Sequence, residues 1–204
     1  MDFYHNLITE KSWQLVCQLK NKYRFILIGG WAVFLYTKAL KSKDIDLVVD
    51  FENLERMKND FGIAKNDRLK KYEAKVQATD IDIYVPFYSW PGLPAQDLES
   101  FKVSLEGFLT VEKEVLAILK QEVLLERTNS LKGKKDLIDL LSLFQLADFD
   151  FGKYNSIIAQ YQLEKNLREI IQIIKKTGQI SELDLNSYRL SRLKKRILAG
   201  IGLF

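Results

Sequence analysis

Two short patterns in the first quarter of the chain constrain its fold most. They are a pair of glycines, Gly29 and Gly30, directly after an apolar stretch, and two aspartates, Asp44 and Asp46, directly before another. Residues two apart in a strand point to the same face, so the two aspartates are expected to project together. Two carboxylates held this close repel each other unless a cation lies between them. The second pattern therefore predicts a strand that carries a cation site.

The glycine pair precedes residues 31–40, whose composition predicts a helix. The backbone N–H groups and the positive dipole end of a helix N-terminus favour phosphate groups. Carboxylate oxygens are the ligands that Mg²⁺ prefers. A phosphate cradle beside a carboxylate pair predicts metal-assisted transfer of a nucleotidyl group.

A third carboxylate is available in the alternating segment 79–85. Asp80 and Asp82 lie two residues apart there, so both are expected to share one face of a strand. Any single pair of this kind also suits a solvated strand face. Two such strands behind a glycine turn favour a metal site.

This arrangement resembles the nucleotidyltransferase superfamily that includes polymerase beta, kanamycin nucleotidyltransferase and the AbiEii toxins. The resemblance covers residues 25–85: an apolar strand, two glycines, a short helix and an Asp-x-Asp strand. It implies a fold in which a mixed sheet with flanking helices carries the site. It also favours Asp82 as the third carboxylate, with Asp80 as the alternative.

The resemblance implies two Mg²⁺ ions, held by Asp44, Asp46 and Asp82, and a nucleoside triphosphate such as ATP as substrate. The implied nucleotide-binding residues are Gly29, Gly30, Trp31 and Lys43. Trp31 replaces a small or polar residue of the superfamily pattern, which leaves the phosphate contact at that position open.

A second resemblance, over residues 109–144, is to the AbiEii-like branch. An apolar helix carries Lys120, and a later helix begins with Lys135-Asp136 followed by Asp139. The resemblance implies that Lys120 contacts nucleotide phosphates and that Asp136 completes the site. A lysine in this place would neutralise charge that develops on the triphosphate. A solvated lysine, and an aspartate that serves the helix dipole, are the alternatives.

The acceptor of the nucleotidyl group stays open. The branch resemblance favours RNA, such as the 3′ end of a tRNA, and implies an antitoxin protein as a partner. An aminoglycoside-like small molecule and a protein hydroxyl are the other acceptors. A nucleotide-binding module without turnover is the alternative of a different class.

Composition excludes several other classes of protein. No apolar run approaches the roughly 20 residues that span a bilayer, and residues 1–5 lack the basic start of a signal peptide. One cysteine, Cys17, cannot form an internal disulfide, and one histidine, His5, argues against a histidine-rich zinc site. We therefore expect a cytoplasmic protein with no membrane partner.

The net charge of +4 is too small to demand a nucleic-acid partner. Basic residues nevertheless gather in two segments, 65–71 and 189–196, which either follow an RNA backbone or form solvated faces. Three aromatic residues lie in the loop 86–94, and they either stack on a nucleobase or pack against the core. They are Phe87, Tyr88 and Trp90.

The expected architecture is α/β (α+β), with a catalytic domain over residues 1–110 and a helical bundle over 111–204. The expected strands are 25–28, 44–49, 71–78, 80–85 and 101–110, with a bulge or tight bend between the third and fourth. The expected helices are 6–21, 31–40, 53–59, 112–127, 134–147, 153–176 and 181–198.

Overall fold

The computed structural model describes residues 6–202, so His5 and the expected features of the first five residues lie outside the described part. The chain divides into two compact units, with the division between Glu112 and Lys113. Each unit is described by itself. Among the helices of residues 6–202, none is both long enough and apolar enough to cross a membrane.

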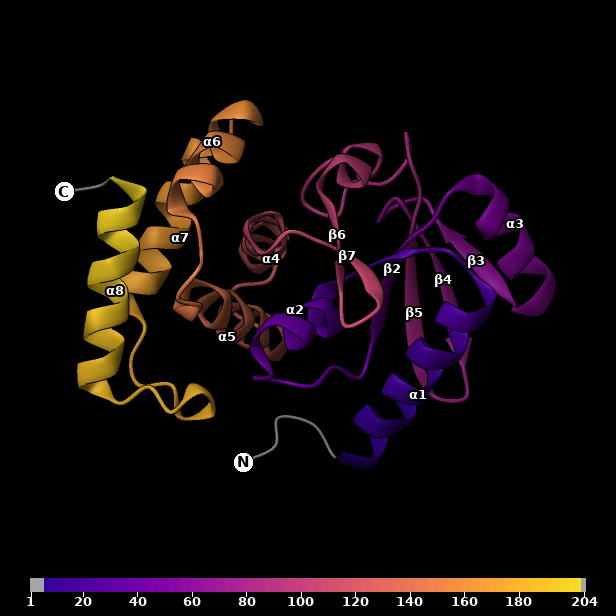
Figure 1. Ribbon diagram of the computed structural model, residues 1–204, viewed down its shortest axis with the longest axis horizontal. Coiled ribbons are helices and arrows are strands. Elements are labelled where there is room, and N and C mark those ends of the chain that lie inside the picture. Colours follow the sequence, from indigo (N-terminus) through magenta and orange to yellow (C-terminus); the bar gives the residue numbers. More distant parts are fainter. Residues whose placement is uncertain (1–5, 203–204) are drawn as a thin grey trace. The chain divides into compact units, whose positions relative to one another are not determined.

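The first unit is a mixed sheet with helices (Figure 1). Over residues 6–112 the strand order is β3-β4-β5-β2-β1-β7-β6. In chain order its elements are α1 (Asn6–Lys22), β1 (Ile26–Ile28), α2 (Gly29–Thr37), β2 (Ile45–Val48), α3 (Phe51–Asp60), β3 (Ile63–Asn66), β4 (Lys71–Val76), β5 (Thr79–Tyr84), the 3₁₀ helix η1 (Ala95–Phe101), β6 (Lys102–Leu105) and β7 (Phe108–Val111).

The centre of the sheet positions the expected site. β1 runs antiparallel to β2, and β2 runs parallel to β5. Ile45 and Leu47 of β2 pair with Ile81 and Ile83 of β5, and all four side chains are fully buried. Because side chains alternate along a strand, the residues between them point to the other face of the sheet. That face carries the aspartates.

Two hairpins at the margins of the sheet differ from expectation. The single strand expected over 101–110 is wrong, because β6 and β7 are two strands joined at Glu106 and Gly107. Both turn residues have positive φ, 51° and 76°, which suits a two-residue hairpin turn. The bend expected before β5 is a two-residue turn at Gln77-Ala78. Strand β3 was not expected at all.

The second unit consists of helices. They are α4 (Lys113–Glu126), α5 (Leu131–Gln145), α6 (Phe151–Gln160), α7 (Glu164–Lys176), the 3₁₀ helix η2 (Ser181–Leu183) and α8 (Ser187–Ile201). The single helix expected over 153–176 is wrong, since a break at residues 161–163 separates α6 from α7 and Gln162 there has φ 57°. The last helix begins at Ser187, where Asn186 accepts a hydrogen bond from the Arg189 N–H, and not at Ser181. The expected fold class, a mixed sheet with flanking helices followed by a helical bundle, is confirmed.

Candidate active site

Asp46 and Asp82 lie side by side on neighbouring strands. They are register partners in the parallel pairing of β2 with β5, and both are half-buried. Asp44 lies in a bend one residue before β2 and is also half-buried. Its charge is among the causes that raise the pKa of Asp82. Asp46 and Asp82 are thus neighbours across the sheet, and Asp44 lies just before the start of β2.

Asp82 has a basic partner that the sequence patterns did not single out. The Lys71 ammonium on β4 lies 2.6 Å from the Asp82 carboxylate and 3.0 Å from that of Glu73. Burial raises the pKa of Asp82, Lys71 opposes this, and the charges of Glu73 and Asp44 add to the rise. Burial lowers the pKa of Lys71, but the Asp82 carboxylate outweighs this and the net direction is upward. The proton affinity of Asp82 is therefore higher than that of an ordinary aspartate.

Asp80, the alternative third carboxylate, has a different environment. It is exposed, and its nearest basic group is Lys75 at 3.6 Å. The Asp82 side chain is only 26% exposed, and Asp82 is the register partner of Asp46 on the neighbouring strand. Burial and register therefore favour Asp82, although its role stays a prediction.

Gly29 makes the close approach to Asp46 that the glycine pattern implied. It has φ +65°, and a Cβ at this position would lie 2.0 Å from Oδ2 of Asp46. No side chain larger than hydrogen fits there without a shift. Helix α2 begins at this residue, its N-cap is Ile28, and its first turn has neither a side-chain cap nor an acidic residue. Gly30 follows in the same turn, so the first amides of α2 lie beside Asp46.

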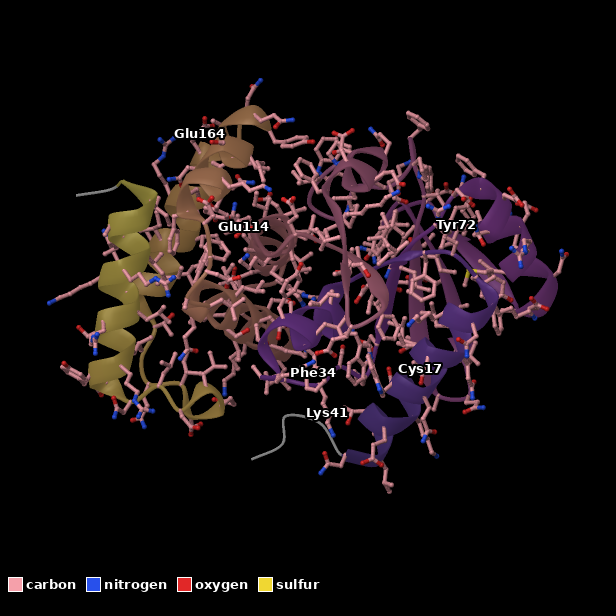
Figure 2. All side chains as sticks on the ribbon, in the orientation of Figure 1. Cys17, Phe34, Lys41, Tyr72, Glu114 and Glu164 are labelled. Atoms are coloured by element: carbon pink, nitrogen blue, oxygen red, sulfur yellow. The ribbon has the colours of Figure 1, made fainter. Side chains whose placement is uncertain are left out.

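The Trp31 side chain belongs to the core of the first unit. It is 1% exposed, its Nε1 donates a hydrogen bond to the Ser12 hydroxyl at 2.9 Å, and its ring lies 4.9 Å from that of Trp13. Phe34, labelled in Figure 2, packs edge-on against it at 5.5 Å. Trp31 therefore offers only its backbone to a phosphate. Lys43 is half-buried in the bend next to Asp44.

Lys120 and Asp136 meet in the second unit. Lys120 Nζ on α4 lies 3.1 Å from the Asp136 carboxylate on α5, and both residues are buried. Arg127 binds the other oxygen of Asp136 through two nitrogens, at 2.8 and 2.7 Å. Asp136 is thus a bridge between two cations. The expected contact of Lys120 with nucleotide phosphates stays a prediction.

Asp139 is a member of this cluster that the sequence analysis did not select. It is fully buried, and its Oδ2 lies 2.7 Å from Lys120 and 3.0 Å from Lys135. Its Oδ1 has no hydrogen-bond partner among the described residues. Burial raises the pKa of Asp139, but the two ammonium groups outweigh this and lower it overall. The three-residue spacing from Asp136, which places both on one helix face, was the available signal.

Most basic residues of the segment 189–196 that make described contacts serve helix ends. Lys194 donates to the carbonyls of Lys175 and Thr177, at 2.8 and 2.6 Å, at the end of α7. Arg196 donates to the carbonyl of Leu146 at 2.7 Å, at the end of α5. Helix C-termini leave such carbonyls without intrahelical partners. These contacts favour a structural role for the cluster over an RNA surface.

The carboxylates of the site meet some of the requirements of a divalent-cation site and fail to meet others. Asp44 and Asp46 supply the oxygen donors that Mg²⁺ prefers, and Gly29, because it has no Cβ, leaves room for the Asp46 carboxylate. Over residues 6–202, however, no three acidic, histidine or cysteine side chains converge as a ready metal cluster. Asp82 is paired with Lys71 instead. Asp82 therefore acts as a third metal ligand only if the Lys71 ammonium moves away from its carboxylate.

Three solved structures resemble the chain over nearly its whole length. An antigenic nucleotidyltransferase-like protein from Paracoccidioides brasiliensis has 19% identity and a TM-score of 0.53, with 96% of each chain covered. The chain has a nucleotidyltransferase-like fold. JHP933 from Helicobacter pylori has 16% identity and a TM-score of 0.52, with 96% of this chain and 92% of that one covered.

Another solved structure from H. pylori, of a protein provisionally described as a nucleotidyltransferase, has 17% identity and a TM-score of 0.52 over 97% of this chain and 96% of its own. No protein-family model matches the chain, and no curated protein matches it. At these identities the nucleotidyltransferase-like fold is what the structures share. The likeness to AbiEii toxins stays a prediction.

Proposed function

We propose that this chain is a metal-dependent nucleotidyltransferase that transfers a nucleoside monophosphate from a nucleoside triphosphate to a hydroxyl acceptor. The observation that carries the proposal is the register pairing of Asp46 with Asp82, with Gly29 of a helix N-terminus directly against Asp46. An anion-binding helix start beside paired carboxylates suits a triphosphate that carries cations. The nucleotidyltransferase-like fold supports the same reading.

Each group has a defined task in this reaction. Asp44 and Asp46 would hold one Mg²⁺ ion, and Asp82 would help to hold a second. The two ions would neutralise the charge of the triphosphate. The first amides of α2, from Gly29 and Gly30, bind the β- and γ-phosphates. The acceptor oxygen forms a bond to the α-phosphorus while the bond to the pyrophosphate oxygen breaks, and pyrophosphate leaves.

Asp82 is the group suited to take the proton of the acceptor hydroxyl. Its raised pKa brings its proton affinity closer to that task than an ordinary aspartate's. Lys71, at 2.6 Å, opposes this rise in the pKa of Asp82 and so favours its ionised form. The acceptor that we favour is RNA, in line with the AbiEii resemblance, and a small molecule or a protein hydroxyl are the alternatives.

The test is incubation of the protein with Mg²⁺, each α-³²P-labelled nucleoside triphosphate separately, and total RNA. Asp46→Asn, which keeps the shape of the side chain, should lower incorporation at least about 100-fold, because it removes charge at the site of chemistry. Asp80→Asn is the matched control on the exposed neighbour, and it should leave incorporation unchanged. Full activity of Asp46→Asn would show that the metal assignment is wrong.

The Lys71–Asp82 ion pair favours one second candidate, a nucleotide-binding module without turnover. The Lys71 ammonium beside Asp82 supplies the positive charge that a second metal ion would otherwise bring to this carboxylate. Isothermal titration with and without Mg²⁺, together with a pyrophosphate assay, separates the two readings. A module would bind nucleotide and release no pyrophosphate with any acceptor.

A further inference from the structure

The β3–β4 turn and the loop after β5 lie together at one end of the first unit's sheet. The Tyr88 hydroxyl in the loop donates a hydrogen bond to the Asp67 carboxylate in the turn at 2.9 Å. The Tyr88 ring also packs 5.8 Å from that of Tyr72 on β4, which is labelled in Figure 2. Two segments that are separate in the sequence, one basic and one aromatic, are thus held against each other through Tyr88.

We call this region the tip surface. Its members are Lys65, Arg68, Lys70, Phe87 and Trp90. Lys65 and Lys70 lie over the Tyr88 ring, with their ammonium groups 4.7 and 5.3 Å from its centroid. Lys65 also pairs with Asp67 at 2.8 Å, and Arg68 and Lys70 are exposed. This differs from helix α8, where basic side chains bond to backbone carbonyls.

Two large rings of the tip surface face solvent. Phe87 is 85% exposed and Trp90 is 62% exposed. Phe87 also has φ +61°, an unfavourable conformation for an aromatic residue, and its N–H donates to the Gln96 side chain at 3.0 Å. The loop therefore exposes an apolar ring to water at a position where the backbone itself is held by a hydrogen bond. A core-packing role for these two rings is wrong, whereas Tyr88 is packed.

The tip surface is continuous in the chain with the proposed acceptor site. Lys71 directly follows Lys70, and its ammonium lies on the Asp82 carboxylate at 2.6 Å. In the proposed reaction Asp82 takes the proton of the acceptor hydroxyl. A polymer bound along the tip surface would thus have its end near the group that activates it.

We propose that the tip surface binds single-stranded RNA, the acceptor of the reaction proposed above, on which this inference rests. Basic side chains neutralise phosphates, and exposed rings stack on bases of any sequence. A duplex keeps its base faces inside its own stack, so these rings favour a single strand. The tip surface supplies both basic side chains and exposed aromatic rings, from two segments that Tyr88 connects.

The test is fluorescence anisotropy with a labelled RNA strand of about ten nucleotides, alone and annealed to its complement. Mg²⁺ and nucleoside triphosphate are left out, so that binding is measured without chemistry. Trp90→Ala should weaken single-strand binding at least about 5-fold, because stacking on one ring is lost. Trp90→Phe should restore most of the affinity. Tyr188→Ala is the matched control, an exposed ring of the second unit, and should have no effect.

The contribution of the basic side chains is tested by the salt dependence of the same RNA binding. Arg68→Gln/Lys70→Gln should lower the slope of log K against log salt by about 1.4, since each phosphate contact on a single strand contributes about 0.7. Arg192→Gln/Lys195→Gln on α8 changes the net charge equally and should leave the slope unchanged. Both pairs are exposed, so thermal unfolding should be the same for all variants.

Three outcomes would overturn the proposal. They are no RNA binding, binding that follows the α8 variants instead of the tip variants, and competition by poly-glutamate as effective as that by RNA. The last would assign the surface to an acidic protein. Pyrophosphate release with an acceptor other than RNA, without RNA binding, would refute this surface and leave the nucleotidyltransferase standing. RNA binding retained by an inactive Asp46→Asn protein would support the surface independently of catalysis.

Discussion

Substitution of Gly29 by alanine tests whether the glycine turn and the aspartate strand act together. A Cβ on Gly29 would lie 2.0 Å from Oδ2 and 2.6 Å from Cγ of Asp46. Ordinary contact begins at 3.4 Å, so the carboxylate would have to move by about 1.4 Å or the turn would have to open. The substitution therefore acts on the position of Asp46 without changing its charge.

The matched control is Gly107→Ala in the β6–β7 turn. Gly107 has φ +76°, so both substitutions place a side chain in the left-handed region, at about 1–2 kcal/mol each. The Cβ of the control meets only the end of the flexible Lys20 side chain, at 2.9 Å. Gly29→Ala should lose about 1–3 kcal/mol more, because its clash is with a side chain anchored on the central strand.

The two variants should differ more in activity than in stability. A displacement of about 1 Å at a reacting centre costs about 100-fold in rate, so Gly29→Ala should lose about that much nucleotidyl transfer. Gly107→Ala should keep full transfer. Urea unfolding and pyrophosphate release measure the two quantities on the same preparations. Equal destabilisation by the two substitutions, or unchanged transfer by Gly29→Ala, would refute the reasoning.

Lys71→Met should move the acid limb of the kcat/KM profile to higher pH, because the Lys71 charge lowers the pKa of Asp82 against burial; a limb that stays in place would exclude Asp82 as the base. Asp139→Asn should cost about 3–5 kcal/mol of unfolding free energy at pH 7, since it leaves the buried Lys135 ammonium without its carboxylate and leaves Lys120 with Asp136 alone. The folded pKa of Asp139 is lowered, so the wild-type advantage should persist above the ordinary carboxyl pKa of about 4 and shrink as the pH falls below it. Arg196→Met should cost about 1–2 kcal/mol by loss of its carbonyl bonds, and Arg192→Met, on the same helix but exposed, should cost under about 0.5; similar costs would show that the carbonyl bonds add little.

The centre of the sheet could be predicted because local pattern and final burial agree there. Apolar residues alternate with aspartates on β2 and β5, and the burial follows the same alternation. The presence of a helix after the glycine pair was predictable for a related reason, since Gly29-Gly30 after a fully buried strand has few other uses, but α2 covers Gly29–Thr37 and not the expected 31–40. Periodicity fixes which residues share a face. It does not fix register, so periodicity alone did not separate Asp80 from Asp82, and only the resemblance favoured Asp82.

The elements that were missed are those whose ends carry no strong local signal. The apolar spacing of α6 continues into α7, and the break between them depends on Gln162, which adopts a left-handed conformation without being glycine or asparagine. Strand β3 is short, polar and at the edge of the sheet, so it has no apolar alternation to reveal it. β3 is held by pairing with β4, its neighbour in the chain, but its own four residues give no signal of that pairing.

The basic residues show why charge in a sequence does not identify a surface. The segments 65–71 and 189–196 look alike as runs of lysine and arginine. In the fold, Lys194 and Arg196 donate hydrogen bonds to carbonyls at helix ends, and Lys71 forms an ion pair with Asp82. What separates a binding surface from a structural one is therefore the partner of each cation. Lys65 and Lys70 lie over the Tyr88 ring, and the loop that carries Tyr88 also carries the exposed rings of Phe87 and Trp90, so this region offers a polymer both charge and stacking.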